Sequence, residues 1–352
     1  MTTDTFLGQL RCPSCVLHGQ GLLERVAGDW LLCQEPDCGR KYPIRDGLPI
    51  LFKDEGEKWV NVKPEDLPLT ALANKPVVPD AEWLARKAQE SRITILQMVI
   101  RAGSGHIGGA YSAVDLVTAL YFRVMKHDPS DPSWEGRDRL IYSKGHTCLA
   151  LYSALAHAGY FRPSRLKEFL VDDGLLAGHP EMGHIPGVEV TTGSLGHGLP
   201  LANGIAMALK MDGGQQRIIT IMGDGECNEG SNWEAFMCSA QFGLDRITAI
   251  IDNNKLESLA PTSEIMAIEP MADKLRSFGW GVREIDGHNM AEIIDALEST
   301  PFEPGKPSAI VAHTIKGKGV SFMEGVTKWH QRGLTPDEAE TAFAELAQGI
   351  RS

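Results

Sequence analysis

Two short apolar runs, each followed by polar residues, constrain the fold of this chain more than any other feature. Residues 218–222 and 247–251 are apolar apart from one threonine each, a composition typical of parallel strands buried on both faces. Between them, residues 232–241 have the composition of a helix. A strand, a helix and a strand in this order form a right-handed βαβ unit. We therefore predict an α/β fold with a mostly parallel sheet flanked by helices.

The same alternation continues on both sides of this unit. Asp80 is suited to cap a helix N-terminus, and apolar residues recur after it at helical spacing. Further elements are expected as a helix at about 290–298, a strand at 308–313 and a final helix at 335–350. We assign residues 80–352 to one large domain, which is within the usual size of a single core.

Four of the seven cysteines lie close together near the N-terminus. Cys12, Cys15, Cys33 and Cys38 fall within 27 residues, and the other three are scattered. Two such pairs on turns can converge on a tetrahedral zinc site, and a segment of ~50 residues has too little core to fold well without a metal. Buried thiols without a metal are the alternative. We predict a structural Zn2+ bound by all four cysteines.

The segment that holds these cysteines resembles a known family of small domains. Its Cys-Pro-x-Cys start and the stretch Tyr42-Pro-Ile-Arg-Asp-Gly-Leu-Pro49 are similar to the zinc ribbons of tRNA-methyltransferase activator subunits. The resemblance implies a zinc ribbon at residues 1–53 that serves as a protein-binding adaptor. Because Asp46-Gly47 is a tight-turn dipeptide, we expect a hairpin around it.

Residues 54–79 differ from both neighbouring segments. They are rich in lysine, glutamate and aspartate and contain four prolines, so we predict an extended linker that buries little apolar surface. The formal net charge of the chain is −12, which argues against nonspecific binding to nucleic acid or to an anionic membrane. No apolar run reaches the ~18 residues of a membrane span, and residues 1–10 lack the pattern of a signal peptide. We expect a cytoplasmic protein.

Polar residues follow both of the buried strands predicted at 218–222 and 247–251. Gly223-Asp224-Gly225 comes directly after the first strand, and Asn254 lies just past the second. Ligands in open α/β sheets bind at the carboxyl ends of strands. The glycines let the backbone approach a phosphate, and the oxygens of Asp224 and Asn254 suit Mg2+. A helix that starts near Gly230 would point its N-terminus at the same anion.

The combination of Gly223-Asp224-Gly225 with Asp252-Asn253-Asn254-Lys255 at this spacing resembles the diphosphate motif of thiamine-diphosphate enzymes. The resemblance implies that the cofactor lies against Gly223 and Gly225. It also implies that Asp224, Asn254 and the backbone carbonyl of Leu256 hold a divalent ion, Mg2+ or else Ca2+ or Mn2+. Glu229 would lie beside the cofactor and face a partner subunit.

Several of the eleven histidines directly follow a glycine in a loop. The segments are Ser104-Gly-His106, Ser143-Lys-Gly-His146, Ala177-Gly-His179-Pro-Glu181 and Gly196-His197. A single loop histidine is usually just solvated, but glycines beside several of them allow turns that bring distant segments to one cavity. Histidine is the side chain suited to proton transfer near neutral pH.

These segments are similar to those of transketolases, and the resemblance covers roughly residues 80–330. It implies that His106 and His179 contact substrate oxygens and transfer protons, and that His146 contacts the diphosphate and nearby substrate groups. Residues 191–196 resemble the family's cofactor loop, which places Gly193, Ser194 and Leu195 against the cofactor. Residues 312–319 resemble the segment that closes the site.

Two positions depart from the transketolase pattern. Many members carry two histidines where this chain has Thr327-Lys-Trp-His330, and Thr327 most nearly matches the catalytic one. Whether His330 takes the catalytic role is open. His197 stands where the family commonly has glutamine, and it either contacts cofactor or partner or only fills space.

The resemblance implies transfer of a two-carbon ketol unit from a ketose or ketose phosphate to an aldose or other aldehyde. Ordinary transketolases are about twice as long, and their second domain binds the aminopyrimidine and supplies the activating glutamate. We therefore expect a separate pyrimidine-binding subunit and an α2β2 heterotetramer. The alternatives are an α-type subunit of the decarboxylating component of a 2-oxo acid dehydrogenase, a related decarboxylating synthase such as deoxyxylulose-phosphate synthase, and a non-catalytic adaptor.

Overall fold

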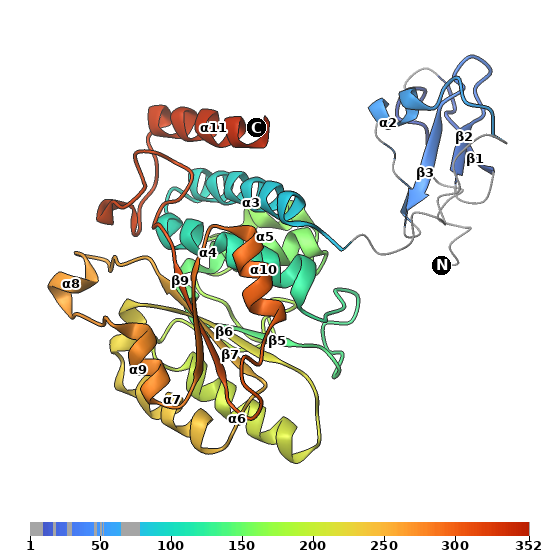
Figure 1. Cartoon of the computed structure of the whole chain (residues 1–352). Coiled ribbons are helices and arrows are strands. Elements are labelled where there is room, and N and C mark those ends of the chain that lie inside the picture. Colours follow the sequence, from blue (N-terminus) through green and yellow to red (C-terminus); the bar gives the residue numbers. More distant parts are fainter. Residues whose placement is uncertain are drawn as a thin grey trace. The chain divides into compact units, whose positions relative to one another are not determined.

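The structure is a computed structural model, and it describes residues 10–16, 19–26, 30–45, 48–49, 51, 53–64 and 78–351. The chain divides into two compact units, Met1–Val78 and Pro79–Ser352 (Figure 1). Within the described ranges, every helix is too short or too polar to span a bilayer.

The N-terminal unit contains a four-stranded antiparallel sheet in the order β1-β2-β3-β4. Its elements are β1 (Leu23–Val26), β2 (Trp30–Cys33), β3 (Lys41–Arg45), β4 (Leu48–Pro49) and the helix α2 (Lys53–Lys58). The core of the sheet is small and includes three of the clustered cysteines together with Leu31, Tyr42 and Ile44. Strands β3 and β4 pair as the expected hairpin, whose turn at Asp46-Gly47 lies outside the described residues.

The segment 54–79 is not extended throughout, because it begins within helix α2. Lys41 explains why: its side chain is buried, and Nζ donates hydrogen bonds to the carbonyl oxygens of Trp59 and Val60, at 3.1 and 3.2 Å. These polar contacts, together with packing of the Trp59 ring against Trp30 at 4.9 Å between centroids, order the residues after the sheet, which composition alone does not reveal. Residues 65–77 lie outside the described part of the chain.

The large unit has a five-stranded parallel sheet in the order β5-β6-β7-β9-β8. The strands are β5 (Arg139–Tyr142), β6 (Ile218–Gly223), β7 (Ile247–Asn253), β8 (Gly281–Asp286) and β9 (Ser308–His313). The helices are α3 (Ala81–Ala102), α4 (Ile107–Ala119), α5 (Cys148–Ala158), α6 (Gly198–Met211), α7 (Gly230–Gln241), α8 (Thr262–Ile265), α9 (Met271–Ser277), α10 (Met290–Glu298) and α11 (Pro336–Arg351). The predicted α/β fold with a parallel sheet is confirmed.

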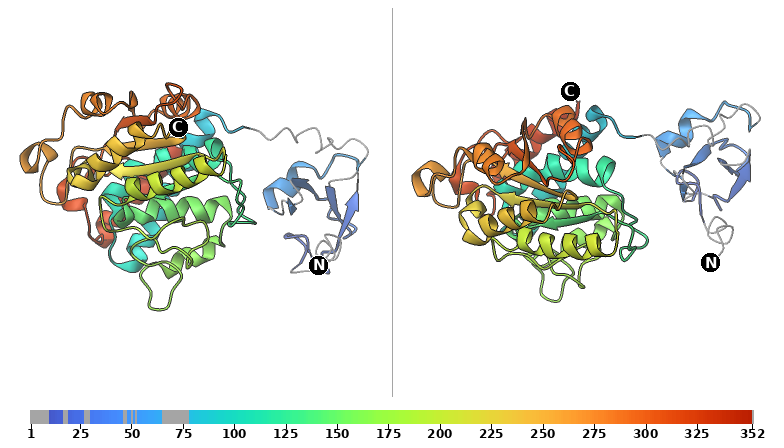
Figure 2. Two further views of the ribbon diagram at one scale, coloured as in Figure 1. Left: turned by 90° about the horizontal axis from the view of Figure 1, so that it is seen from below. Right: turned by 60° about the horizontal axis from the view of Figure 1, so that its bottom comes forward.

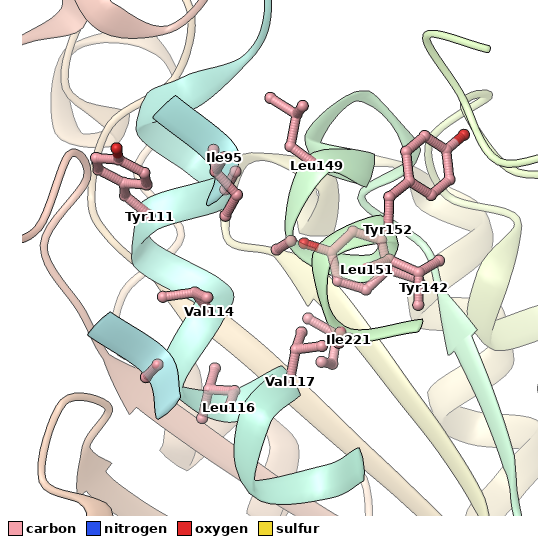
Figure 3. Packing of buried hydrophobic residues seen from close by; sticks show 14 of the residues in the cluster. Ile95, Tyr111, Val114, Leu116, Val117, Tyr142, Leu149, Leu151, Tyr152 and Ile221 are labelled. Atoms are coloured by element: carbon pink, nitrogen blue, oxygen red, sulfur yellow. The ribbon is translucent and has the colours of Figure 1, made fainter. Parts of the chain in front are cut away.

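Helices cover both faces of this sheet (Figures 1 and 2). On one face, Ile219, Ile221 and Ile250 pack against α3, α4, α5 and α10, and Figure 3 shows part of this core. On the other face, the alternate residues Ile218 and Ile251 pack against α6, α7 and α9. Because successive side chains of a strand point to opposite faces, both faces need apolar residues, which explains the uninterrupted apolar runs.

The predicted strands at 218–222, 247–251 and 308–313 are confirmed, and β6 and β7 pair in parallel on either side of α7 in the sequence. The side chain of Asp80 caps α3 by accepting the N–H of Trp83 at 2.8 Å. Trp83 itself is 38% exposed, so fewer residues of α3 are buried than its spacing of apolar residues indicates.

Candidate functional site

The polar residues after β6 and β7 meet because the two strands are parallel neighbours, with Gly223 paired opposite Asp252. Asp224 is buried, and its carboxylate accepts the backbone N–H groups of Gly225 and Lys255. Lys255 adopts a left-handed backbone conformation, with φ of 61°. That turn brings the backbone N–H of Lys255 to Asp224, so the residues after β6 and β7 meet at one edge of the sheet.

A cavity of about 980 Å³ opens at this edge of the sheet. Most of the residues that the sequence predicts for the site line this cavity: Gly193, Leu195, Gly223, Asp224, Gly225, Glu229, Asn254, Leu256, His106, His146 and His330. Four further residues line it that were not predicted, namely Lys144, Glu226, Trp233 and Lys316. The remaining predicted residues, Ser194 and His179, are exposed and do not line the cavity.

Histidines from four separate segments converge beside the strand ends. The ring of His106 lies 5.2 Å from those of both His146 and His330, and 6.5 Å from that of His179, between centroids. Gly193, with φ of 143°, leaves room for the His179 ring, because a Cβ at this position would lie 2.7 Å from that ring. The structure thus brings together all four predicted histidines.

The two departures from the transketolase pattern have different outcomes. His330 lies in the cluster, stacked on His146 at 5.5 Å, whereas Thr327 is half-buried and does not line the cavity. His197 is exposed, and its Nδ1 contacts the carbonyl oxygen of Leu195 at 2.9 Å. In geometric terms, His330 and not Thr327 occupies the site.

The environment keeps the three histidines of the cavity neutral. Burial, then nearby charge, lowers the pKa of His106 to about 4, of His330 to about 3 and of His146 to about 2. The nearby positive charges belong to Lys144 and Lys316, and a proton on one imidazole of the cluster would also disfavour a proton on its neighbour. A neutral imidazole has one donor and one acceptor nitrogen, so each ring can hold a proton or receive one.

Two buried lysines were missed as site residues. Lys144 forms an ion pair with Asp252 and donates to the carbonyl oxygen of Gly109 at 3.2 Å. Lys316 donates to the carbonyl oxygen of Leu256 at 2.9 Å, and its Nζ lies 3.0 Å from Nδ1 of His330. Burial, together with Lys144, lowers the pKa of Lys316 to about 8. The sequence does contain a clue to both lysines, because each directly precedes a glycine in a segment that resembles the transketolase site.

Asp252, near the end of β7, accepts hydrogen bonds from several residues close to the cavity. It is fully buried and accepts hydrogen bonds from the hydroxyls of Ser112 and Thr314 as well as from Lys144. Burial opposes the charge of its carboxylate, but Lys144 and these hydrogen bonds hold the pKa below its usual value. Asn254 also reaches this group, with Nδ2 3.4 Å from Asp252.

Glu226 is a second buried carboxylate that sequence reasoning missed. It accepts hydrogen bonds from the Ser143 hydroxyl and from the backbone N–H groups of Gly196 and Gly223, the latter two at 3.1 Å. Burial raises its pKa. Because these donors lie on two loops and at the end of β6, Glu226 connects the loop at 143–146 and the loop at 191–196 to that strand.

The residues at the strand ends can hold a divalent cation and a diphosphate. Asp224, Asn254 and Leu256 line one cavity and offer oxygen atoms, the ligands that Mg2+ prefers. Burial and the nearby Asp252 raise the pKa of Asp224 to about 6, so a cation would relieve a carboxylate that lacks a cationic side-chain hydrogen-bond partner among those described. The buried amines of Lys144 and Lys316 complement an anion.

In the N-terminal unit, the four clustered cysteines converge as predicted. Their sulfur atoms all lie within 4.8 Å of one another, a spacing compatible with Zn–S bonds of about 2.3 Å. The guanidinium of Arg40 donates to Cys38 at 3.5 Å; although burial opposes it, this contact lowers the pKa of Cys38 to about 7. The donor set fits a structural zinc ion.

Comparison with known proteins identifies the family to which the large unit belongs. Residues 85–349 match the family model described as transketolase, thiamine diphosphate binding domain. A 6-deoxy-6-sulfo-D-fructose transketolase subunit of Clostridium sp. is 46% identical over 75% of this chain and 96% of its own length. An apulose-4-phosphate transketolase subunit of Phocaeicola vulgatus is 42% identical over 76% of this chain and 95% of its own length.

Solved structures agree in fold and differ in length. The transketolase from Leishmania mexicana superimposes with a TM-score of 0.71 at 30% identity, over 75% of this chain. The chain spans only 41% of that protein. About three quarters of the chain corresponds to nearly the whole length of each of the two subunits, and to about two fifths of the single-chain enzyme.

Proposed function

The chain belongs to the transketolase family, and from that premise we propose that it is the thiamine-diphosphate-binding subunit of a split transketolase. The reaction is transfer of a two-carbon ketol unit from a ketose to an aldehyde acceptor. One observation carries the proposal: four histidines converge beside Asp224 and Asn254 in a chain that spans 96% of a relative named as a separate subunit.

Thiamine diphosphate, when bound, supplies the carbanion that ketol transfer requires. Asp224, Asn254 and the carbonyl of Leu256 would hold the Mg2+ that accompanies the diphosphate. Lys144 and His146 lie beside them in the cavity wall, where a buried ammonium stabilises an anion strongly because the local dielectric constant is low. Gly193 and Leu195 line the cavity next to these groups and would pack on the cofactor.

The histidines provide groups that hold and move protons. Because the Lys316 ammonium donates to Nδ1 of His330, the ring proton of His330 is on Nε2 and is available to a substrate oxygen. His106 adjoins both His330 and His179, so a proton released by a sugar hydroxyl meets a neutral acceptor. We assign substrate orientation and proton transfer to His106, His179 and His330.

Completion of the site requires a second chain under this proposal. We expect a pyrimidine-binding subunit to supply the activating glutamate and to cover the cavity near Glu229, with two copies of each chain in an α2β2 assembly. The supporting fact is that relatives matched over 94–96% of their own length are named as transketolase subunits. A cytoplasmic location belongs to the same proposal.

The N-terminal unit forms a separate part of the proposal. We propose that residues 1–53 are a zinc ribbon with one structural Zn2+ on Cys12, Cys15, Cys33 and Cys38, that residues 54–79 link it to the domain at 80–352, and that the ribbon binds a protein. The convergence of the four sulfur atoms supports the zinc ion. The family match begins only at residue 85, which supports treating the ribbon as an addition.

The names of the relatives suggest a class of donor substrate. One is named for 6-deoxy-6-sulfo-D-fructose and another for apulose-4-phosphate, and both compounds are ketoses with an anionic group. We propose that this chain also acts on a ketose with a terminal sulfonate or phosphate.

The test mixes the purified chain with the product of a neighbouring transketolase C-terminal reading frame, thiamine diphosphate and Mg2+. Anionic ketoses and aldehydes are supplied in pairs, and two-carbon transfer is followed by mass spectrometry. Transfer by the mixture, but by neither chain alone, is expected. His106→Asn should abolish transfer, and His184→Asn, at an exposed histidine outside the cavity, should not. Release of CO2 from a 2-oxo acid, without ketol transfer, would instead identify a decarboxylating subunit.

A further inference from the structure

His288 lies outside the cavity, in the turn between β8 and α10, yet it makes two directed contacts. Its Nδ1 is 2.7 Å from the carboxylate of Asp115, and its Nε2 accepts the backbone N–H of Ile315 at 2.8 Å. An amide N–H can only donate, so Nε2 carries the lone pair and the proton is on Nδ1. The imidazole therefore joins α4 to the segment after β9 as a neutral ring with both nitrogens used.

The carboxylate behind His288 is itself held by a buried ion pair. Arg92 on α3 pairs with Asp115, and their side chains are only 6% and 7% exposed. The same guanidinium donates through Nε to the carbonyl oxygen of Lys318 at 3.1 Å. His288 and Arg92, both bound to Asp115, thus hold the backbone at residues 315 and 318 from one side.

The segment between these two anchors carries Lys316. The N–H of Gly317 donates to the carbonyl oxygen of Gly108 at 3.0 Å, two residues after His106 at the start of α4. From this backbone, Lys316 reaches the carbonyl oxygens of Leu256 and Glu257 and Nδ1 of His330, at 2.9, 3.0 and 3.0 Å. A shift of residues 315–318 would move the Lys316 amine away from all three.

We propose that His288 is a positioning residue for ketol transfer, which together with Asp115 and Arg92 fixes residues 315–318 and so aims Lys316 at His330 and the Leu256 carbonyl. The inference rests on the proposed function only in naming the reaction. The positioning itself is a property of the folded chain. A side chain must donate to a carboxylate at one end and accept an amide at the other to fill this role, and neutral histidine does both through one rigid ring.

Three substitutions separate the two contacts. His288→Phe keeps a planar ring and removes both contacts, while Asp115 retains Arg92. His288→Asn places an amide near Nδ1, which can still donate to Asp115, but it is too short to accept from Ile315. His288→Gln is long enough for its carbonyl oxygen to accept from Ile315. His184→Asn serves as the matched control, because His184 is an exposed histidine of the same unit.

The first readout is amide hydrogen exchange of the chain alone, without cofactor or partner. In His288→Phe and His288→Asn, the peptide that contains residues 313–320 should exchange about fivefold to tenfold faster, as expected for loss of one hydrogen bond. Peptides from β6 and β7 should not change, and His288→Gln should recover most of the protection. A uniform increase over the whole unit, or no change at 313–320, would overturn the proposal.

The second readout is transfer by the complete enzyme. Both disruptive variants should lower kcat about tenfold while the KM for the sugars changes little, because only an interaction that positions a reacting group is lost. His288→Gln should rescue kcat. An unchanged kcat in His288→Phe would reject the positioning role even where exchange is faster. If no partner supports transfer by the wild type, the proposed function fails, but the exchange result still decides the anchoring of residues 315–318.

Discussion

Replacement of Asp252 by asparagine should destabilise the large unit strongly. Asp252 and Lys144 form an ion pair with side chains that are 0% and 3% exposed, so Asp252→Asn leaves an ammonium buried without its counter-charge. Removing one partner of a buried pair costs about 3–5 kcal/mol. Asparagine also places an N–H2 group where one carboxylate oxygen stood, so either the Thr314 hydroxyl, or the Ser112 hydroxyl and Lys144, loses its acceptor, and this keeps the cost from falling below that range.

The assay is thermal unfolding by calorimetry on the intact chain, with urea unfolding as a second measure. For a unit of this size, each 1 kcal/mol lowers Tm by about 2–4 °C, so Asp252→Asn should lower the main transition by about 6–20 °C. Glu303→Gln is the matched control, because Glu303 and Lys306 form an ion pair at the surface, with side chains 52% and 48% exposed. Loss of such a pair changes stability by less than about 1 kcal/mol.

A double variant separates loss of the pair from loss of one partner. Lys144→Met with Asp252→Leu removes both charges and should recover at least half of the lost stability, since apolar replacement of a buried pair is often neutral. The reasoning is refuted if Asp252→Asn costs less than about 1 kcal/mol, or if the double variant is no more stable than the single one.

Three further predictions concern the proposed zinc site, the proposed cofactor site and the histidines. Cys33→Ser, or a strong chelator, should release about one zinc ion per chain and make the N-terminal unit protease-sensitive without a change in the Tm of the large unit; metal analysis and limited proteolysis test this. Glu226→Gln should weaken thiamine diphosphate binding about tenfold in calorimetry, because an amide replaces the acceptor of the Gly223 N–H. Burial lowers the pKa of His330 to about 3 in the folded chain, against about 6.5 when unfolded. The unfolded state therefore binds more protons as pH falls below about 6.5, and the stability of the folded chain declines from there toward the folded pKa. His330→Gln should lessen the drop in Tm that the wild type shows between pH 7 and pH 5. An equal drop in the variant would contradict a neutral, buried His330.

The sequence predicted the centre of the sheet better than its edges. Strands β6, β7 and β9 are buried on both faces, so each contains a run of mostly apolar residues that is easy to recognise. Strand β8 lies at one edge, where Arg283 and Glu284 break the apolar run, and β5 at the other edge has only four residues. Neither was predicted. Helix α4 was also missed, because all thirteen of its residues are buried and no amphipathic period remains.

Sequence reasoning found site residues whose spacing belongs to a motif and missed those defined by distant contacts. Asp224, Asn254 and the glycine-linked histidines could be found by their order along the chain. Glu226 is next to the motif, but its partners Ser143 and Gly196 are 83 and 30 residues away. Lysines are usually solvated, so burial of Lys144 and Lys316 becomes visible only when the loops that surround them are placed.

The buried lysines explain how an acidic chain can combine anion binding with proton transfer. The net charge is −12, yet the cavity holds the amines of Lys144 and Lys316, which supply local positive charge for a diphosphate. The same charges add to burial in lowering the pKa of His146 and His330. Protonated imidazoles would only donate hydrogen bonds and would repel these lysines, whereas neutral ones also accept protons. Because the lysines already provide the charge, the histidines remain free to exchange protons with a sugar near neutral pH.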